Sequence, residues 1–414
     1  MGKKFNTIDL FAGCGGLYDG FEKAGGFKSV GFVEWEKSPC DTLIKRLNTR
    51  WNYQNAESIV LRFDIQRTEE LLTGWENDSL YGSNKGLIKV VGDKNVDIVI
   101  GGPPCQAYSI AGRVRDENGM KDDYRNYLFE SYLKVVEKFH PFIFVFENVE
   151  GILSARPGDE SIVKRITTSF NRAGYYIIDD LRKYALLNAA DYGIPQNRKR
   201  VIIIGINLSK FNHDPKTALI DFYTQILPSH KTAKQVTVEK AIGDLPSILP
   251  INSIEFKNNK RISHSVNGCK ILNHVPRFHS ERDQRIFFEL AADKINATNK
   301  YPDVKSLIAL YQKETGKKSN FHKYNVLELH KPSNTIPAHL YKDGLRHIHP
   351  DPKQARTITP REAARLQSFD DDFEFIGSIG DQYKMIGNAV PPILAEKIAS
   401  ALKTFINKYF EPVN

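Results

Sequence analysis

The segment Gly101-Gly-Pro-Pro-Cys105 combines residue types that could present a nucleophile. A largely apolar run over residues 96–100 precedes it and is typical of a buried strand. The two glycines let the chain turn sharply and the two prolines stiffen it, so the thiol of Cys105 would be held in one place. Because holding a reacting group in position lowers the entropic cost of a reaction, Cys105 is a candidate nucleophile. A loop cysteine with a purely structural role is the alternative on this pattern alone.

A second group of residues could hold a ligand that contains adenosine. Asp9-Leu-Phe-Ala-Gly-Cys-Gly-Gly16 falls between an expected strand and an expected helix, where glycines allow the backbone to approach a ligand closely. Dinucleotide, nucleotide and methyl-donor sites all use such a turn, and a tight turn without a ligand is the alternative. Glu34 ends the next expected strand, where a carboxylate can accept both hydroxyls of a ribose. Trp35 beside it offers a flat face for a purine.

The elements that must position these residues alternate along the first two hundred residues. Amphipathic stretches, such as residues 128–139, predict helices. Apolar runs predict strands over residues 7–11, 29–34, 96–100, 142–146 and 201–206. This alternation is typical of an α/β domain with a doubly wound, Rossmann-like sheet. The polar, glycine-containing segment from Thr73 to Lys94 is interpreted as a surface insertion.

The sequence changes in character after about residue 206. From there to residue 349 the periodicity weakens, and helical patterns remain only near 284–295 and 304–314. Regular patterning returns at Thr359, which can cap a helix, and Pro360, which can occupy its first position. We therefore predict a second, smaller and irregular domain.

Length and composition limit the class of protein. Of the 414 residues, 41% are hydrophobic and 26% are charged, which is typical of soluble globular domains, and the length suits two domains. The longest apolar runs are too short to cross a membrane and no secretory signal is expected, so we expect a cytoplasmic protein without a membrane partner. The four cysteines lie far apart and without paired spacing, so neither a disulfide framework nor a metal site is expected.

The net charge of +9 is concentrated in one part of the chain. Residues 206–350 hold 22 lysines and arginines against 13 aspartates and glutamates, so the rest of the chain is neutral overall. Ten of the 11 histidines also fall there. Such a region can bind a polyanion, with counterion release as the driving force, although a solvated basic surface explains the charge alone equally well.

In their order along the chain, these motifs resemble those of the DNA (cytosine-5)-methyltransferase family, in the form found in bacterial restriction-modification systems. The resemblance covers both ends of the chain and leaves out only about residues 207–334. Four further segments complete it: Glu147-Asn-Val149, Gln196-Asn-Arg-Lys-Arg200, Thr359 to Gln367, and Gly387-Asn-Ala-Val-Pro-Pro392.

The resemblance implies a role for each matching residue. Cys105 would be the nucleophile and Glu147 the acid that contacts the target base. Arg198 and Arg200 would add positive charge near that base. S-adenosylmethionine would bind at the glycine turn and at the ends of the following strands. The implied donor-binding residues are Asp9, Phe11, Ala12, Gly13, Gly15, Gly16, Glu34, Trp35, Asp64, Ile65, Pro103, Asn388 and Ala389.

The implied reaction explains why these residue types are needed. Carbon 5 of cytosine is a poor nucleophile, and addition of the Cys105 thiolate to carbon 6 would create an enamine that can attack the methyl sulfonium. Glu147 would hold or donate a proton at ring nitrogen 3, while the arginines would hold the carbonyl oxygen of the base and favour the thiolate. A base would then remove the proton from carbon 5, and Cys105 would leave. Because the target atom is stacked inside a duplex, the base must be flipped out.

The resemblance also implies domains and partners. Residues 1–206 plus 375–414 would form the S-adenosylmethionine-binding catalytic domain. Residues 207–374 would form a small target-recognition domain whose variable part is about 207–334. Double-stranded DNA would be the substrate, S-adenosylhomocysteine the second product, and a restriction endonuclease a functional partner, with no metal required. We expect a monomer that associates with DNA in the bacterial cytoplasm.

Other classes of protein explain the sequence less completely. A dinucleotide-dependent oxidoreductase would share the glycine turn and Glu34, but it has no use for Cys105 or Glu147. Enzymes that methylate the amino groups of bases need no cysteine. A tRNA cytosine-5 methyltransferase shares the motifs and the length, and only the large basic region favours DNA. A non-enzymatic DNA-binding repressor is the alternative from another class, although an inactive relative would be expected to lose Cys105 or Glu147.

Overall fold

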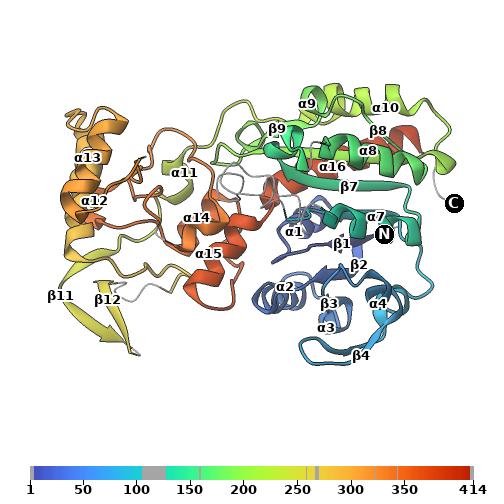
Figure 1. Ribbon diagram of the computed structural model, residues 1–414, viewed down its shortest axis with the longest axis horizontal. Coiled ribbons are helices and arrows are strands. Elements are labelled where there is room, and N and C mark those ends of the chain that lie inside the picture. The colour runs from blue at the N-terminus through green and yellow to red at the C-terminus, as the bar shows by residue number, and fades with distance from the viewer. Residues whose placement is uncertain are drawn as a thin grey trace. The chain divides into compact units, whose positions relative to one another are not determined.

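The computed structural model describes residues 4–104, 127–157, 160–257, 259–265, 270–320, 322–342 and 344–410. These residues form two compact units, whose elements are labelled in Figure 1. The first unit contains the described residues up to Gly193, then Arg198–Ala233, and those from Ala389 onward. The second contains Ile194–Asn197 and Lys234–Asn388.

An eight-stranded sheet forms the centre of the first unit, in the order β3-β2-β1-β6-β7-β10-β8 with β9 paired to β10. The strands are β1 (Phe5–Leu10), β2 (Phe27–Glu34), β3 (Val60–Arg62), β6 (Ile98–Gly101), β7 (Ile143–Val149), β8 (Tyr175–Ile177), β9 (Leu186–Asn188) and β10 (Lys199–Asn207). The first five of these run parallel, whereas β10 is antiparallel to β7. The carboxyl ends of the parallel strands therefore share one edge, where doubly wound sheets bind ligands. This sheet confirms the predicted fold class.

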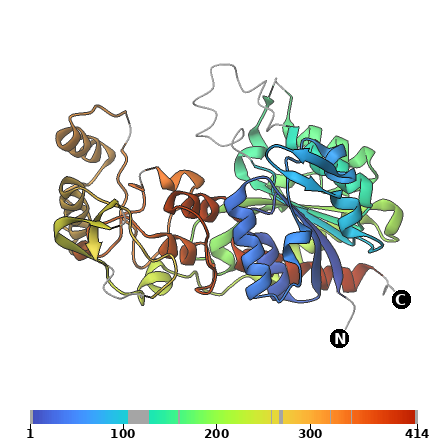
Figure 2. The same cartoon turned by 90° about the horizontal axis from the view of Figure 1, so that it is seen from below.

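Helices lie on both sides of this sheet (Figure 2). Gly31 of β2 faces α5, because a Cβ at this glycine would lie 2.8 Å from Leu87 Cδ1. The next residue, Phe32, contacts Tyr18 of α1 with ring centroids 4.8 Å apart. Since successive residues of a strand point to opposite faces, α1 and α5 cover opposite faces. The longer helices of this unit are α1 (Gly16–Ala24), α2 (Lys37–Thr49), α4 (Thr68–Thr73), α5 (Gly86–Val91), α7 (Leu128–Phe139), α8 (Ile162–Arg172), α10 (Pro215–Asp221) and α16 (Pro392–Tyr409).

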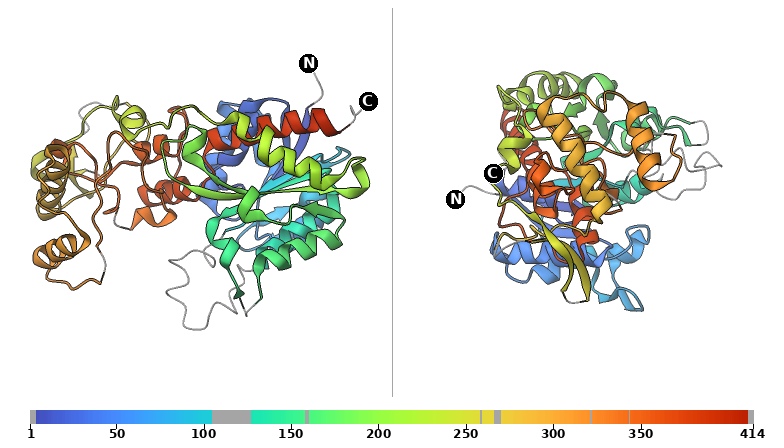
Figure 3. Two further views of the ribbon diagram at one scale, coloured as in Figure 1. Left: turned by 90° about the horizontal axis from the view of Figure 1, so that it is seen from above. Right: turned by 90° about the vertical axis from the view of Figure 1, so that its left-hand side faces the viewer.

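The last helix, α16, packs along the first helix, α1 (Figure 3, left). A Cβ on Gly20 of α1 would lie 2.4 Å from the carbonyl oxygen of Pro392, so this glycine allows the two backbones to touch. Lys403 Nζ donates to the carbonyl oxygen of Ala24 at 3.2 Å. The end of the chain thus supports the helix that follows the glycine turn.

The second unit has little sheet, and two of its helices share a buried hydrophobic cluster. Its hairpin consists of β11 (Leu249–Lys257) and β12 (Lys260–Ser265), and its helices include α11 (Val238–Ile242), α12 (Glu281–Asn296), α13 (Val304–Thr315), α14 (Pro360–Leu366) and α15 (Ile379–Asn388). Ile286, Phe287 and Leu290 of α12 share a buried cluster with Leu310 of α13. Figure 3, right, shows these two helices in orange. Helical patterns near 284–295 and 304–314 are therefore confirmed.

A buried polar network surrounds the start of α14. Thr359 caps this helix as predicted, since its Oγ1 accepts from Glu362 N at 3.2 Å and Glu362 Oε2 accepts from Thr359 N at 2.7 Å. Arg356 binds both carboxylate oxygens of Glu362, at 2.7 and 2.6 Å, and neither side chain is more than 1% exposed. His349 Nε2 lies 3.4 Å from Glu362 Oε1. The network therefore satisfies the buried carboxylate completely.

The short segment Ile194–Asn197 belongs to the second unit although first-unit residues flank it in the chain. Gln196 Nε2 donates to the carbonyl oxygen of Leu366 at 3.1 Å, and Gln196 Oε1 accepts from Ile336 N at 2.9 Å. Asn197 N donates to the carbonyl oxygen of Ser333 at 2.8 Å. The predicted basic motif, Gln196 to Arg200, is thus divided between the two units.

The boundaries of the units differ from the predicted domain boundaries. Residues 207–233 belong to the first unit, because α10 packs on β8 and the turn after α10 packs on α16. Residues 375–388 belong to the second unit, because α15 packs on α14. Assignment of the units to catalysis and to recognition stays a prediction.

The interpretation of Thr73 to Lys94 as a surface insertion is wrong in part. This segment forms β4 (Trp75–Asp78), β5 (Gly82–Asn84) and α5. Trp75, Leu87 and Val91 are buried at 5%, 0% and 1% exposure. A few buried apolar residues thus anchor a segment whose other residues are polar. Because the polar residues are the majority, the sequence showed no apolar periodicity that predicts a strand or a helix here.

Candidate active site

The glycine turn joins the end of β1 to the start of α1 at Gly16. Its backbone is left-handed at Phe11 (φ 57°), Gly13 (φ 56°) and Gly15 (φ 91°). For Phe11, which has a Cβ, this conformation is costly and is typical of functional sites. A Cβ at Gly13 would meet no atom within 4 Å. The turn therefore has open space beside its backbone, where a ligand could lie.

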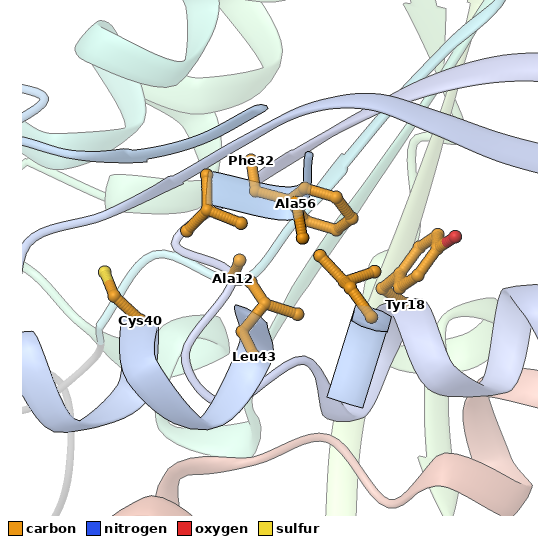
Figure 4. Close-up of a cluster of buried hydrophobic side chains, with 8 residues drawn as sticks. Ala12, Tyr18, Phe32, Cys40, Leu43 and Ala56 are labelled. Atoms are coloured by element: carbon orange, nitrogen blue, oxygen red, sulfur yellow. The ribbon is translucent and has the colours of Figure 1, made fainter. Parts of the chain in front are cut away.

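A hydrophobic cluster packs against the turn and holds it in position. Ala12 belongs to this cluster together with Tyr18, Phe32 and Leu43, as Figure 4 shows. Gly15 lies against the same leucine, because a Cβ there would be 2.6 Å from Leu43 Cδ1. These two predicted donor-binding residues therefore shape the turn through packing.

Glu34, at the end of β2, faces the glycine turn. Its Oε2 accepts a hydrogen bond from Gly13 N at 2.9 Å, and its Oε1 accepts from Trp35 N at 2.9 Å and Glu36 N at 2.8 Å. Burial raises the pKa of Glu34 to about 7, and the three N–H donors oppose this rise. A carboxylate offers about four acceptor positions, so about one remains for a hydroxyl group of a ligand.

Asp9 lies on β1, two residues before Phe11, and is fully buried. Neither carboxyl oxygen has a hydrogen-bond partner among the described residues. Burial, and then the nearby negative charge of Glu34, raise the pKa of Asp9 well above its usual value. Because an unpartnered buried carboxyl costs free energy, this arrangement favours a ligand that brings donor groups.

Trp35 and Asp64–Ile65 follow the ends of the neighbouring strands β2 and β3. Trp35 is 46% exposed, so its ring remains accessible, whereas Ile65 is buried. Phe63 N donates to the carbonyl oxygen of Glu34 at 3.0 Å and so ties this segment to the end of β2. The residues predicted to contact ribose and adenine therefore share one edge of the sheet.

Glu147, on β7, lies beside the chain that leads towards Cys105. A Cβ on Gly102 would be 2.6 Å from Glu147 Oε2, so glycine lets the backbone pass close to this carboxylate. Asn148 Nδ2 donates to the carbonyl oxygen of Pro103 at 3.3 Å. The ends of β6 and β7 thus bring the acid next to the segment that precedes the cysteine.

Strand β10 brings two arginines to this acid. Arg200 Nε lies 2.7 Å from Glu147 Oε1, and both side chains are 11% exposed. Arg198 is buried, and its Nη2 donates to the carbonyl oxygen of Ala389 at 3.1 Å. Burial and the positive charge of Arg200 lower the pKa of Arg198, while Glu147 opposes this effect. The three charged groups therefore form one electrostatic cluster.

The predicted nucleophile and the two predicted residues of the last motif complete the candidate set. Cys105 lies outside the described residues. Asn388 ends α15 in the second unit, whereas Ala389 belongs to the first. Cys14 and Cys40 are free and buried, and burial raises the pKa of Cys14 to about 12, which suppresses its thiolate.

Two contacts of the site were not predicted from the sequence. The sequence indicated Asn148 as a site residue, because it stands next to Glu147 in a motif. It did not indicate that Asn148 donates to a backbone carbonyl, because sequence patterns do not reveal such contacts. The bond from Arg198 to Ala389 joins residues 191 positions apart.

Within the described ranges, no group of three or more His, Cys, Asp or Glu side chains could hold a metal ion. Nor is any helix in that part of the chain long and apolar enough to cross a membrane.

Comparison with known proteins supports the predicted resemblance. Residues 5–404 match the family model described as C-5 cytosine-specific DNA methylase. Type II methyltransferase M.Bpa9945I of Bacillus paralicheniformis is 32% identical over 97% of this chain and 99% of its own. Type II methyltransferase M1.HphI of Haemophilus parahaemolyticus is 32% identical over 95% of this chain and 86% of its own.

A solved structure agrees with these matches. It is described as a DNA modification methyltransferase encoded within an E. coli prophage, and it is 26% identical with a TM-score of 0.63. The match covers 98% of this chain and 100% of the other. The chain therefore belongs to the family of C-5 cytosine-specific DNA methylases and is a DNA (cytosine-5)-methyltransferase.

Proposed function

We propose that this enzyme methylates carbon 5 of a flipped cytosine within a specific double-stranded DNA sequence, through a covalent bond between Cys105 and carbon 6. One observation carries the proposal: Glu147, its partner Arg200 and the backbone of Gly102 converge at the carboxyl ends of β6 and β7. An acid, a cation and the chain leading to a cysteine are the groups that activation of a cytosine ring requires.

The donor of this family is S-adenosylmethionine, which carries its methyl group on an electrophilic sulfonium and leaves as S-adenosylhomocysteine. The residues of the first unit fit such a donor. Glu34 has about one acceptor position left for a ribose hydroxyl, and the exposed ring of Trp35 can lie against the purine. The two buried oxygens of Asp9, which have no hydrogen-bond partner in the part of the chain that the structure describes, suit the ammonium group of the methionine part. The open space beside Gly13 would let the donor reach Glu34, Trp35 and Asp9.

In the proposed reaction, the Cys105 thiolate adds to carbon 6 and the electron pair of the 5,6 double bond becomes available at carbon 5. Carbon 5 takes up the methyl group. A base then removes the proton from carbon 5, the double bond re-forms, and the thiolate leaves. Cys105 is thus regenerated, and the net change is replacement of one hydrogen by one methyl group.

Glu147 and the two arginines would stabilise the charge that develops in the ring. Addition at carbon 6 pushes electrons towards ring nitrogen 3, where Glu147 can hold a proton. Arg200 pairs with Glu147 and can turn a second donor towards the carbonyl oxygen of the base. Arg198 is buried and bonded to Ala389, so in this proposal it adds to the positive field and holds the last motif.

Recognition of DNA would belong to the second unit. The basic excess lies in residues 206–350, most of which belong to that unit. Lysines and arginines there can bind phosphates, and polar side chains can read the edges of bases in the major groove. We place the sequence-reading residues between about 234 and 334, the part of the second unit that carries none of the shared motifs. Because counterion release would drive binding, affinity should fall steeply with salt.

The biological role would be protection of host DNA. The relatives named above are type II methyltransferases of bacteria. By analogy, this enzyme would act on bacterial DNA in the cytoplasm and be paired functionally with a restriction endonuclease that cleaves the same unmethylated sequence.

Trapping on 5-fluorocytosine tests the covalent mechanism. Duplexes that carry this base would be incubated with the enzyme and S-adenosylmethionine, and complexes that survive denaturation would be counted. Methyl transfer can proceed on this base, but fluorine cannot leave as a proton does, so elimination stalls. We expect a trapped complex that requires the donor.

Cysteine variants supply the controls. Cys105→Ala should abolish both trapping and methylation, whereas Cys40→Ala and Cys269→Ala should each still trap. Methylation by Cys105→Ala, or methylation by the wild-type protein without any trapping, would refute the mechanism. Faster turnover on tRNA than on duplex DNA would favour the rival substrate.

A further inference from the structure

We infer that the β4–β5 hairpin positions the adenine of the methyl donor, acting through Phe63 and through Tyr81. This inference rests on the proposed function, because it takes Asp64–Ile65 as the segment that contacts adenine. The hairpin follows α4 in the chain, and Figure 1 labels β4 next to that helix. Nothing in the shared motifs extends to it.

Phe63 connects the adenine segment to the hairpin. Its ring stacks on Trp75 of β4, with centroids 3.9 Å apart and planes inclined by 22°. The ring of Tyr81 lies 5.1 Å from the same ring, centroid to centroid. The backbone of Phe63 also bonds to Glu34, the residue proposed to hold the ribose. One buried residue therefore contacts both the hairpin and the ribose site, and it immediately precedes Asp64.

Two arginines fasten the tip of the hairpin to the sheet. Arg62 Nη1 donates to the carbonyl oxygen of Leu80 at 3.3 Å, and its guanidinium lies 5.6 Å from the ring centroid of Tyr81. Arg67 Nη1 lies 2.5 Å from Asp78 Oδ2, and Asp78 Oδ1 accepts from Tyr81 N at 2.9 Å. Single surface ion pairs contribute little to stability, but together these bonds hold the tip in one conformation.

The base of the hairpin is closed by two glycines. Gly74 (φ 116°) precedes β4, and Gly86 (φ 82°) follows β5. A Cβ on Gly86 would lie 2.4 Å from Gly74 N, so the two backbones touch and larger residues would separate them. Anchored at its base by Trp75 and at its tip by the arginines, the hairpin is a fixed element.

The ring of Tyr81 packs against Phe63, the residue that immediately precedes Asp64. Burial raises the pKa of Tyr81, and the negative charge of Asp64 raises it further. The tyrosine is only partly buried, so part of its ring is available to a ligand held at Asp64. A flat ring packed against the segment that carries Asp64 suits a purine whose amino group donates to that carboxylate. Tyr81 is thus a positioning residue for adenine.

Donor binding by Tyr81→Ala in the full-length protein tests the inference. We expect the Kd for S-adenosylhomocysteine, measured by titration calorimetry, to rise about tenfold, because one aromatic wall of the site is lost. The KM for S-adenosylmethionine should rise similarly, while kcat at saturating donor stays unchanged. Tyr81→Phe keeps the ring and should restore nearly wild-type affinity. If Tyr81→Ala acted only through a general loss of packing, its effect would not be confined to donor binding.

Tyr176→Ala is the matched control, because it removes another partly buried tyrosine from β8, at the opposite edge of the sheet. It should leave the Kd unchanged. Should Tyr81→Ala fail to fold, Arg62→Gln releases the hairpin tip and should raise the Kd about threefold. An unchanged Kd in the folded variant would overturn the inference and leave the proposed function standing. Absence of donor binding by the wild-type protein would instead overturn the proposed function.

Discussion

Both units bury acidic side chains, but Asp9 and Glu34 of the first unit and Glu362 of the second lie in different surroundings. The oxygens of Asp9 have no partner among the described residues, and the pKa values of Asp9 and Glu34 are raised. Glu362 is bound by Arg356 and by the backbone of Thr359. Burial alone would raise its pKa, but Arg356 and His349 lower it. The first arrangement is costly without a ligand, whereas in the second both carboxylate oxygens of Glu362 already accept hydrogen bonds.

This difference distinguishes carboxyl groups that could bind a ligand from one that stabilises the fold. A buried group without partners costs free energy, and a protein keeps such a group where a ligand can supply the missing partner. A buried ion pair with every lone pair satisfied needs no ligand and specifies one arrangement of the chain. We therefore expect changes at Glu362 to affect folding, and changes at Asp9 to affect donor binding.

Removing the partner of Glu362 should have the largest effect. Arg356→Met leaves a fully buried carboxylate without its cation, which costs on the order of 3–5 kcal/mol. Urea unfolding followed by circular dichroism would measure the loss. The double variant Arg356→Met with Glu362→Gln removes both charges and should recover part of it. A change below about 1 kcal/mol in the single variant would show that the pair does not stabilise the second unit.

Mild acid should weaken the second unit and not the donor site. Burial lowers the pKa values of His264, His347 and His349 to about 4, against about 6.5 in unfolded chains. Between these values the unfolded chain binds protons that the folded chain does not, so stability falls as pH drops from 6.5 to 4, by up to about 3 kcal/mol for each histidine.

Glu34 should respond in the opposite direction. Its folded pKa of about 7 lies above the unfolded value of about 4.3, so the folded state binds its proton first and gains stability as pH falls through that window. Hydrogen exchange at pH 7.5 and 5.5, corrected for the intrinsic rate, would compare peptides from the two units. Equal loss of protection in both units would contradict the comparison.

A neutral replacement of Asp9 should have the smallest effect on stability and a clear effect on the donor. Asp9→Asn keeps the shape but removes a carboxyl that is costly to bury, so donor-free stability should stay the same or rise by about 1 kcal/mol. The Kd for S-adenosylhomocysteine should rise about tenfold, because an acceptor for its ammonium is lost. Unchanged affinity would remove Asp9 from the donor site.

The fold of the first unit was largely predictable from the sequence. Alternating apolar runs and amphipathic stretches located the strands, and residues 128–139 form α7 with the predicted limits. The antiparallel direction of β10 was not predictable, because apolar periodicity carries no information on strand direction. The pairing of Arg200 with Glu147 depends on that direction and on the register of β10 against β7, so only the structure reveals it.

The second unit was predictable only in outline. The basic segment 206–350, most of which lies in this unit, holds ten histidines, but His264, His274, His279, His347 and His349 are buried. Burial lowers their pKa values, so they add no positive charge at neutral pH. Counts of residue types do not separate exposed from buried histidines, because burial here depends on polar contacts made between distant segments.

The segment Ile194–Asn197 has a consequence for how such enzymes could acquire new specificities. The chain passes between the units four times, after residues 193, 197, 233 and 388. A recombination event that replaced residues 234–388 alone would leave Gln196 behind, facing foreign partners in place of Ile336 and Leu366. If the second unit reads the DNA sequence as proposed, a replacement unit should be retained more readily when it preserves the hydrogen-bond partners of Gln196. Laboratory chimaeras should therefore exchange residues 194–197 together with residues 234–388.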